Sequence, residues 1–200
     1  MNRNKTHLPA QPNSLTGKYN PSPNRTGNRI LAIDPGTREI GVALLEGSDL
    51  LFYGVRTIQH RTTPQELLRD AVGLTVKLIA RHRPDVLAIE RTLVIQQNAA
   101  FLLVVAKKIK AAAKRMGLLV YEYPPATVRQ FICGTEKPTK QETARRIADI
   151  YPHLARHLDL PAEWDRLYYA HIFDAIAVGL MCAHELGGAA SKETGDAGND

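Results

Sequence analysis

Residues 29–47 read RILAIDPGTREIGVALLEG, and this stretch decides the fold. Its first apolar run, residues 30–33, is typical of a strand buried on both faces, because so short and apolar a segment needs cover on each side. The Pro-Gly pair at 35–36 then predicts a tight turn into a second apolar run, residues 40–45. We expect the two runs to pair as a hairpin, which places Asp34 at the rim of a sheet.

A second strand of the same kind ends on Glu90. Residues 85–90 read DVLAIE, and a helical pattern separates them from the first hairpin. Strands joined by a helical crossover run parallel, so Asp34 and Glu90 are expected to face each other at one edge of the sheet. Two carboxylates there repel each other unless a cation lies between them. Either acid alone is as readily explained as the first residue of a loop, but the pair favours a metal site.

Length and composition indicate one domain with a hydrophobic core. The chain has 200 residues, of which 44% are hydrophobic. It has no apolar run of about eighteen residues and no secretory-signal pattern, so we expect a cytoplasmic protein with no membrane partner. Cys133 and Cys182 lie in apolar surroundings without a C-x-x-C or Cys/His spacing, and we expect both to be reduced thiols.

The net charge of +6 is unevenly distributed along the chain. Residues 1–28 carry four basic side chains, no acid and few large apolar groups, so a disordered basic arm is expected there. Residues 29–186 are expected to form the folded domain and residues 187–200 a disordered tail. A basic balance suits a polyanionic partner, but it also suits a protein that merely stays dispersed. The arm either adds phosphate contacts or is an inert leader.

The rest of the pattern predicts a mixed α/β sheet covered by helices. Three consecutive strands can form an antiparallel meander, and the helix-linked strands that follow must be parallel. Besides the strands already described, we expect strands at 50–58 and 118–123, and helices at 64–83, 98–116, 124–133, 140–151 and from about 161 or 165 to 184.

The final helix carries two polar side chains in an apolar pattern. His171 and Asp174 are three residues apart and therefore project from one helix face. A bare Asp among packed apolar groups is costly, so a cation should neutralise it, although a solvated face or a structural His–Asp pair also fits. With Asp34 and Glu90 these residues offer oxygen and imidazole ligands and no thiolate, a set that favours Mg²⁺ or Mn²⁺. Two such ions about 4 Å apart would promote phosphodiester hydrolysis.

Four motifs stand in chain order: IDPGT at 33–37, AIE at 88–90, QNAA at 97–100 and HIFDAIA at 171–177. Together they resemble the RuvC-type Holliday-junction resolvases of the ribonuclease-H-like superfamily, over about residues 29–186. The resemblance implies a ribonuclease-H-like five-stranded mixed sheet, in the order 3-2-1-4-5, flanked by helices. It also implies a homodimeric endonuclease that resolves four-way or branched DNA in recombination and repair with two Mg²⁺ or Mn²⁺ ions. A branch-migration motor is a candidate partner.

The resemblance also assigns roles to single residues. It implies that Asp34, Glu90 and Asp174 are metal ligands, and that His171 stands where members hold either Asp or His. Lys140 is implied to act with them by binding or polarising the scissile phosphate. The residues implied to contact DNA are Arg129, Lys140, Lys137, Arg91 and Leu93.

Three positions depart from the family pattern. Arg129 stands where a lysine is expected, and a guanidinium does not readily give up a proton. Residues 91–94 are RTLV, so Leu93 can act only as an apolar wedge where some relatives carry an aromatic residue. Residues 101–105 are FLLVV, which is bulkier than the small-residue pattern expected of the dimer helix. We therefore expect a changed dimer geometry.

Three other functions compete with this interpretation. A YqgF-type ribosomal-RNA processing nuclease has a similar opening motif, but the Ile-Glu ending at Glu90 argues against it. An actin-like kinase or ATPase requires a second phosphate loop and a second domain, and the chain has room for neither. A non-catalytic junction-binding protein is disfavoured because all four predicted ligand positions are filled.

Overall fold

The computed structural model describes residues 27–36, 39–57, 63–92, 99–158, 160 and 163–193. Five strands form one sheet in the order β3-β2-β1-β4-β5, which confirms the predicted order. Strands β1 to β3 are antiparallel, and β4 and β5 continue the sheet in parallel with β1. The strands are β1 (Arg29–Asp34), β2 (Glu39–Glu46), β3 (Asp49–Thr57), β4 (Val86–Glu90) and β5 (Leu119–Tyr123).

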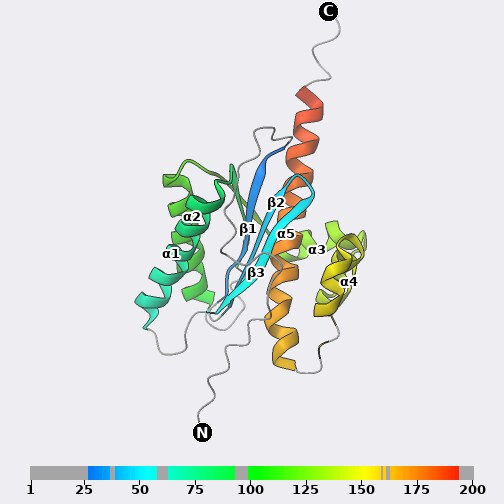
Figure 1. Cartoon of the computed structure of the whole chain (residues 1–200), viewed down its shortest axis with the longest axis horizontal. Helices are drawn as coiled ribbons and strands as arrows, with labels where there is room; N and C mark the ends of the chain where they lie inside the picture. The colour runs from blue at the N-terminus through cyan, green and yellow to red at the C-terminus, as the bar shows by residue number, and fades with distance from the viewer. Residues whose placement is uncertain are drawn as a thin grey trace, which may run out of the picture.

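Helices cover both faces of the sheet, as Figure 1 shows, with α1 and α2 on one side and α3, α4 and α5 on the other. The helices are α1 (Pro64–His82), α2 (Ala99–Arg115), α3 (Pro125–Cys133), α4 (Lys140–Ile150), the 3₁₀ helix η1 (Pro152–His157) and α5 (Glu163–Glu193). None of the helices in the described ranges has the length and apolar composition that a bilayer crossing demands.

The expected end of the last helix, near His184, is wrong. Helix α5 continues to Glu193, so the first residues of the predicted disordered tail, 187–193, are helical. This extension contains no proline, and its Ala, Leu, Glu and Lys residues favour a helix strongly enough to tolerate two adjacent glycines. The rest of that tail and nearly all of the predicted basic arm lie outside the described residues.

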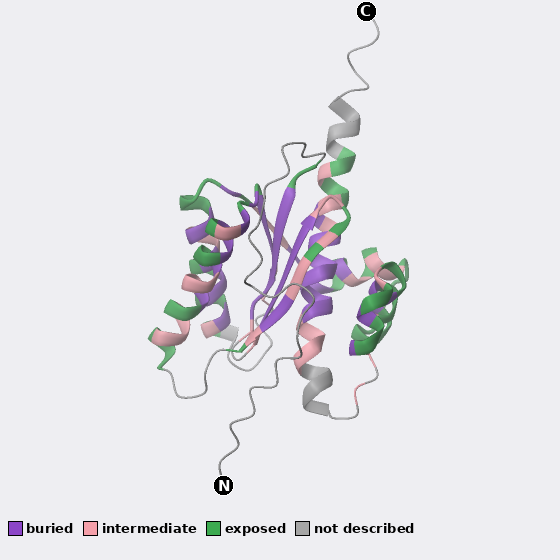
Figure 2. Ribbon diagram, viewed as in Figure 1, coloured by how far each residue is buried: buried purple, intermediate pink, exposed green. Residues whose placement is uncertain are grey.

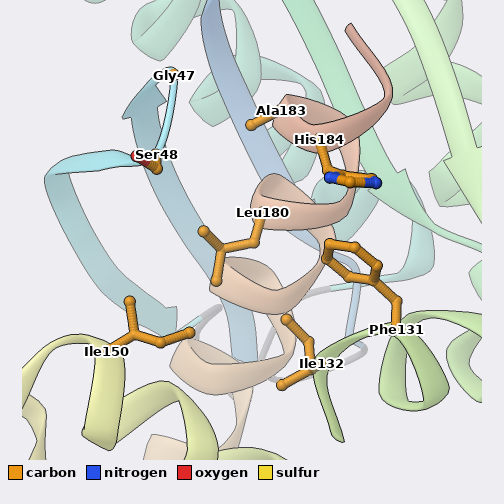
Figure 3. Close-up of a pocket in the computed structure, with 8 residues that line it drawn as sticks. All are labelled: Gly47, Ser48, Phe131, Ile132, Ile150, Leu180, Ala183 and His184. Atoms are coloured by element: carbon orange, nitrogen blue, oxygen red, sulfur yellow. The ribbon is translucent and has the colours of Figure 1, made fainter. Parts of the chain in front are cut away.

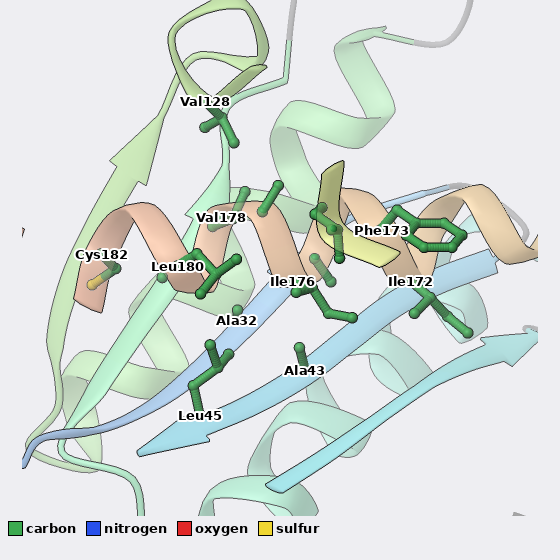
Figure 4. Packing of buried hydrophobic residues seen from close by; sticks show 14 of the residues in the cluster. Ala32, Ala43, Leu45, Val128, Ile172, Phe173, Ile176, Val178, Leu180 and Cys182 are labelled. Carbon is green, nitrogen blue, oxygen red and sulfur yellow. The ribbon is translucent and has the colours of Figure 1, made fainter. Parts of the chain in front are cut away.

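Two hydrophobic cores lie on opposite faces of the sheet, and Figure 2 shows buried residues on the strands and on the helix faces turned toward them. Successive strand residues alternate between the cores, because their side chains point to opposite faces. Thus Ala32 of β1 belongs to the core under α5, whereas Ile33 belongs to the core under α1 and α2. Figure 4 shows the first of these cores, with Ile172 and Ile176 of α5 near Ala43 of β2.

Helix α1 begins at the predicted position, but its buried face differs from the apolar stripe that helical spacing predicts, which is Leu68, Val72, Val76 and Ile79. Thr63 caps its N-terminus, and the Thr63 and Glu66 side chains bond reciprocally to each other's backbone N–H groups. Val76, expected in the stripe, is exposed, whereas Thr75 and His82 are buried. The apolar pattern alone missed these residues because they are polar.

Helix α5 packs directly against the backbone of β2 at Gly41. A Cβ atom at Gly41 would lie 2.0 Å from the carbonyl oxygen of His171, a distance that no side chain can occupy. A Cβ atom at Gly179, two turns further along α5, would lie 2.3 Å from Leu45 Cδ1. These two close approaches set the distance between α5 and the sheet. The approach at Gly41 sets this distance at His171.

We expect Gly41→Ala to lower the free energy of unfolding by about 1–3 kcal/mol or more, because the new methyl group meets rigid backbone. Urea unfolding measures this change. The matched control is Gly73→Ala in α1, where no atom lies within 4 Å of the added Cβ. That variant should gain about 0.5–1 kcal/mol, since alanine favours a helix. Equal stabilities of the two variants would contradict the close packing at Gly41.

Candidate active site

Asp34 and Glu90 end neighbouring parallel strands on the same face of the sheet. The register pairs Ile33 of β1 with Ile89 of β4, so the two acids that follow lie side by side. Side chains alternate along a strand, and Asp34 therefore shares the face of Ala32, which is the face covered by α5. The same alternation turns Glu90 toward α5. The predicted meeting of these two carboxylates at one sheet edge is thus present in the structure.

His171 of α5 contacts Asp34 directly. Its Nδ1 atom lies 2.6 Å from Asp34 Oδ2, and only 6% of Asp34 is exposed. Burial favours the neutral imidazole, but the hydrogen bond and the charge of Asp34 outweigh it and raise the pKa of His171. The contact with Asp34 therefore favours the protonated imidazole. The close approach of α5 at Gly41 makes this contact possible.

Asp174, one helical turn after His171, pairs with Lys140 at the start of α4. Lys140 Nζ lies 2.6 Å from Asp174 Oδ2, and Asp174 is 7% exposed. Both residues are predicted site residues, but the ion pair between them was not predicted. A capping box of Thr139 and Glu142, also not predicted, fixes the N-terminus of α4 beside Lys140. The Thr-x-x-Glu pattern was the available signal.

Glu90 is the most strongly perturbed acid of the site. Its burial, and then the charges of Asp34 and Asp174, raise the pKa of Glu90 to about 8. Lys140 and Arg129 oppose this shift only in part. Burial and the charge of Asp34 also raise the pKa of Asp174, against the attraction of Lys140 and His171. Burial and mutual repulsion therefore favour a proton on this cluster of acids when no metal ion is bound.

The donor set suits a hard divalent cation. Carboxylate oxygens of Asp34, Glu90 and Asp174 and the imidazole of His171 are ligands that Mg²⁺ or Mn²⁺ accepts. The three acids lie close enough that the charges of Asp34 and Asp174 raise the pKa of Glu90 and the charge of Asp34 raises the pKa of Asp174. Within the described ranges, however, no three His, Cys, Asp or Glu side chains are already arranged as a metal cage. Metal binding would require Lys140 and His171 to move from the carboxylates they now contact.

Among the described residues that are predicted to bind DNA, only Lys140 forms a hydrogen bond with one of the three acids. Arg129 of α3 is near enough to Glu90 to affect its pKa, and its Nε donates a hydrogen bond to the Pro125 carbonyl at 3.2 Å. Arg91 and Lys137 are exposed, the first directly after Glu90 and the second in the turn before α4. Leu93 lies outside the described residues. The phosphate-binding roles expected of these residues stay predictions.

A separate apolar pocket of about 450 Å³ lies between the β2–β3 turn and helices α3, α4 and α5 (Figure 3). It adjoins Gly47, at the end of β2 opposite to Gly41, so it is distant from the four predicted ligands. Its lining contains no carboxylate. The pocket is therefore not the candidate active site. Its lining residues are Gly47, Ser48, Phe131, Ile132, Ile150, Leu180, Ala183 and His184.

Comparison with known proteins identifies one family. The sequence model of "Crossover junction endodeoxyribonuclease RuvC" matches residues 30–182. A protein of that name from Heliobacterium modesticaldum is 35% identical over 78% of this chain and 94% of its own length. Another, from Rhodopseudomonas palustris, is 32% identical over 81% of this chain and 90% of its own length.

Solved structures show the same fold. The RuvC structure of Thermus thermophilus superposes with a TM-score of 0.63, at 23% identity, over 82% of this chain and 96% of that one. The T. thermophilus protein has also been solved in complex with a Holliday junction substrate, and this structure matches with the same TM-score at 22% identity. At 22–23% identity these matches establish a shared fold and nothing further. The shared fold agrees with the observed strand order.

We expect Glu90→Gln to stabilise the protein in EDTA by up to about 3 kcal/mol at pH 7. The pKa of Glu90 is raised from 4.5 to about 8, so between these values the folded parent binds more protons than the unfolded chain. Parent stability should therefore fall as the pH rises from 4.5 to 8, and the variant should lack this contribution. Urea unfolding across this pH range measures both effects, with the exposed Glu136→Gln as control.

Divalent ions should make the parent more stable than the Glu90→Gln variant, which is the reverse of the order expected in EDTA. Mg²⁺ or Mn²⁺ that binds the folded parent raises its unfolding midpoint, since a ligand of the native state shifts the folding equilibrium. The Glu90→Gln variant, which lacks one carboxylate, should gain much less. An equal gain in the two proteins would show that Glu90 is not a ligand.

Proposed function

This chain belongs to the RuvC family of crossover junction endodeoxyribonucleases, and from that premise we propose that it resolves four-way DNA junctions at the pocket of Asp34, Glu90 and Asp174. The reaction is hydrolysis of phosphodiester bonds. The observation that supports this site is the convergence of three acids from β1, β4 and α5 on one buried pocket, where burial and mutual repulsion raise the pKa of Glu90 and of Asp174. Nothing in a purely structural role would require such charges to be gathered there.

RuvC family nucleases depend on divalent metal ions. We assign Mg²⁺ or Mn²⁺ to this pocket, two per site, with Asp34, Glu90, Asp174 and His171 as the residues that would hold them. When bound, such ions activate water and stabilise the leaving oxygen of the phosphodiester. Their positive charge also removes the repulsion that raises the pKa of Glu90.

Lys140 is the residue best placed to connect the pocket with DNA. Its side chain is 60% exposed although its ammonium contacts the buried Asp174. Desolvation favours the neutral amine, but Asp174, Asp34 and Glu90 together raise the pKa of Lys140 and keep it charged. If a divalent ion takes its place on Asp174, the ammonium is free to turn outward to a backbone phosphate. Arg129 would add a planar guanidinium contact to phosphate but no proton.

Assembly as a homodimer is part of the proposal. Helix α2 exposes two adjacent large apolar side chains, Leu103 at 41% and Val104 at 45%, next to the exposed Lys107 and Lys108. A second copy would cover the apolar pair, and two active sites would then face the two symmetric strands of a junction. A cytoplasmic location beside the DNA and a branch-migration motor as partner remain predictions.

Incubation of the full chain with a synthetic four-way junction tests the function. We expect two symmetric nicks in Mg²⁺ or Mn²⁺, no cutting in EDTA, and little cutting of a linear duplex of the same sequence. A precursor ribosomal RNA is included as a competing substrate. Preferential cutting of that RNA would favour a ribosomal-RNA processing enzyme, and metal-independent cutting would exclude the proposed chemistry.

Replacing single ligands tests the site. Asp34→Asn and Glu90→Gln should each reduce junction cleavage by about a hundredfold or more, because each removes charge that holds the ions. Junction binding, measured by fluorescence anisotropy, should stay within a few fold of the parent. Asp70→Asn, at an exposed position of α1, is the control and should cut normally. Cleavage by either site variant within a few fold of the parent would remove that residue from the site.

A further inference from the structure

Six aromatic or imidazole rings form a continuous chain of contacts along the edge strand β3. The ring centroids of Tyr53 and His153 lie 5.7 Å apart, and those of His157 and Tyr169 lie 4.4 Å apart in a stacked arrangement. The three other contacts of the chain measure 5.1 to 6.3 Å. We call this set the ring strip. In order of contact its members are Tyr151, His153, Tyr53, His157, Tyr169 and Tyr168.

The exposure of the ring strip differs from that of an ordinary core. Of its six members His157 is buried, the four tyrosines are half-buried and His153 is exposed. Rings that served only to fill space between β3, η1 and α5 would be buried like His157. The outer members instead present aromatic faces that a further planar group can stack on.

A cationic side chain, Arg156, contacts two of these rings directly. Arg156 is exposed, and its guanidinium donates hydrogen bonds to the Tyr53 hydroxyl at 2.8 Å and to His157 Nε2 at 3.3 Å. Helix η1, which supplies Arg156 and both histidines, contains no acid. Burial and the nearby charge of Asp49 raise the pKa of Tyr151 to about 12, so its hydroxyl adds no negative charge at neutral pH. Aromatic faces beside an exposed guanidinium are the combination that binds unpaired nucleic-acid strands.

The ring strip leads to the candidate active site. At one end the Tyr151 hydroxyl donates a hydrogen bond to the Ser48 carbonyl in the β2–β3 turn. At the other end the Tyr168 hydroxyl donates to the Val55 carbonyl at 3.4 Å, and Val55 pairs with Gly41, the residue under His171. From residue 48 to residue 55 a strand spans roughly 20 Å, which is room for several nucleotides. Because β2 lies between β1 and β3, a DNA strand at the pocket would pass the end of β2 near Gly41 and then continue along β3.

We propose that the ring strip binds unpaired bases of a DNA strand that leaves the active site. Bases stack on the accessible rings of His153 and Tyr53, and Arg156 contacts the phosphates between them. Stacking of this kind tolerates any sequence, because every base has a π face. The inference rests on the proposed function in that it takes DNA as the polymer, but it concerns a surface separate from the metal ligands.

Binding of single strands by the full chain tests the proposal. The probe is fluorescently labelled oligothymidylate of about 15 nucleotides, titrated in EDTA and followed by anisotropy, with a blunt duplex of the same length for comparison. We expect His153→Ala and Tyr53→Leu each to weaken binding of the single strand about tenfold, and binding of the duplex less than about twofold. Arg156→Ala should reduce the slope of the log binding constant against the log salt concentration by the amount expected for about one phosphate contact.

The matched control is Tyr121→Leu. Tyr121 is also a half-buried tyrosine, but it lies on β5 at the opposite edge of the sheet, where its ring stacks on Tyr123 at 6.5 Å. This variant should bind the single strand within about twofold of the parent. Circular dichroism checks that each variant is folded, and His153→Ala changes an exposed side chain, so that variant decides the outcome if Tyr53→Leu does not fold.

Three outcomes would overturn the proposal. They are no binding of oligothymidylate by the parent, unchanged binding by folded His153→Ala, and an equal loss of binding in Tyr121→Leu. Cleavage of a four-way junction by the parent in Mg²⁺ is measured in parallel. A parent that binds single strands through the ring strip but cuts no junction would refute the proposed function and leave this inference intact.

Discussion

Repulsion among buried carboxylates is the constraint on which this structure depends. Three acids from three separate elements share one pocket, and burial with mutual repulsion raises the pKa of Glu90 to about 8. Two of the acids contact basic side chains from other parts of the chain: Asp34 contacts His171, and Asp174 contacts Lys140. Such a cluster is unfavourable for folding unless cations share it. Selection for stability alone would have replaced it, so the cluster is best explained by what it binds.

The packing of α5 decides where these charges meet. His171 and Asp174 lie on this one helix, and the helix backbone rests on β2 at Gly41 with no space for a side chain between them. A shift of α5 by the width of a methyl group would therefore move both residues relative to Asp34 and Glu90. Core packing and site geometry are coupled, and a small residue in a strand is as important to the site as a charged one.

Much of this arrangement follows from the sequence, because it depends on short-range periodicity. Strands that end on Asp34 and Glu90 and that are joined by a helix must place both acids at one edge, and the structure has them there. The interaction between Lys140 and Asp174 was not predicted as an ion pair, because it depends on the angle between α4 and α5. The role of Gly41 was missed for the same reason, since its partner is a backbone carbonyl of residue 171. The end of α5 was misplaced because two adjacent glycines in sequence do not stop a helix that is otherwise well supported.

The ring strip offers aromatic side chains at a different place from the position after Glu90, where some relatives carry an aromatic residue and this chain does not. Residues 91–94 contain no aromatic side chain, so this segment offers no ring on which a base could stack. Stacking requires accessible π faces and is not tied to one position in the chain. In the strand order β3-β2-β1-β4-β5, the ring strip lies beside β3, to which Tyr53 belongs, whereas the segment after Glu90 follows β4. The two therefore flank Asp34 from opposite sides. An unpaired strand held on the rings would reach the pocket from the His171 side, and the rings beside β3 would then supply base stacking for which residues 91–94 offer no ring.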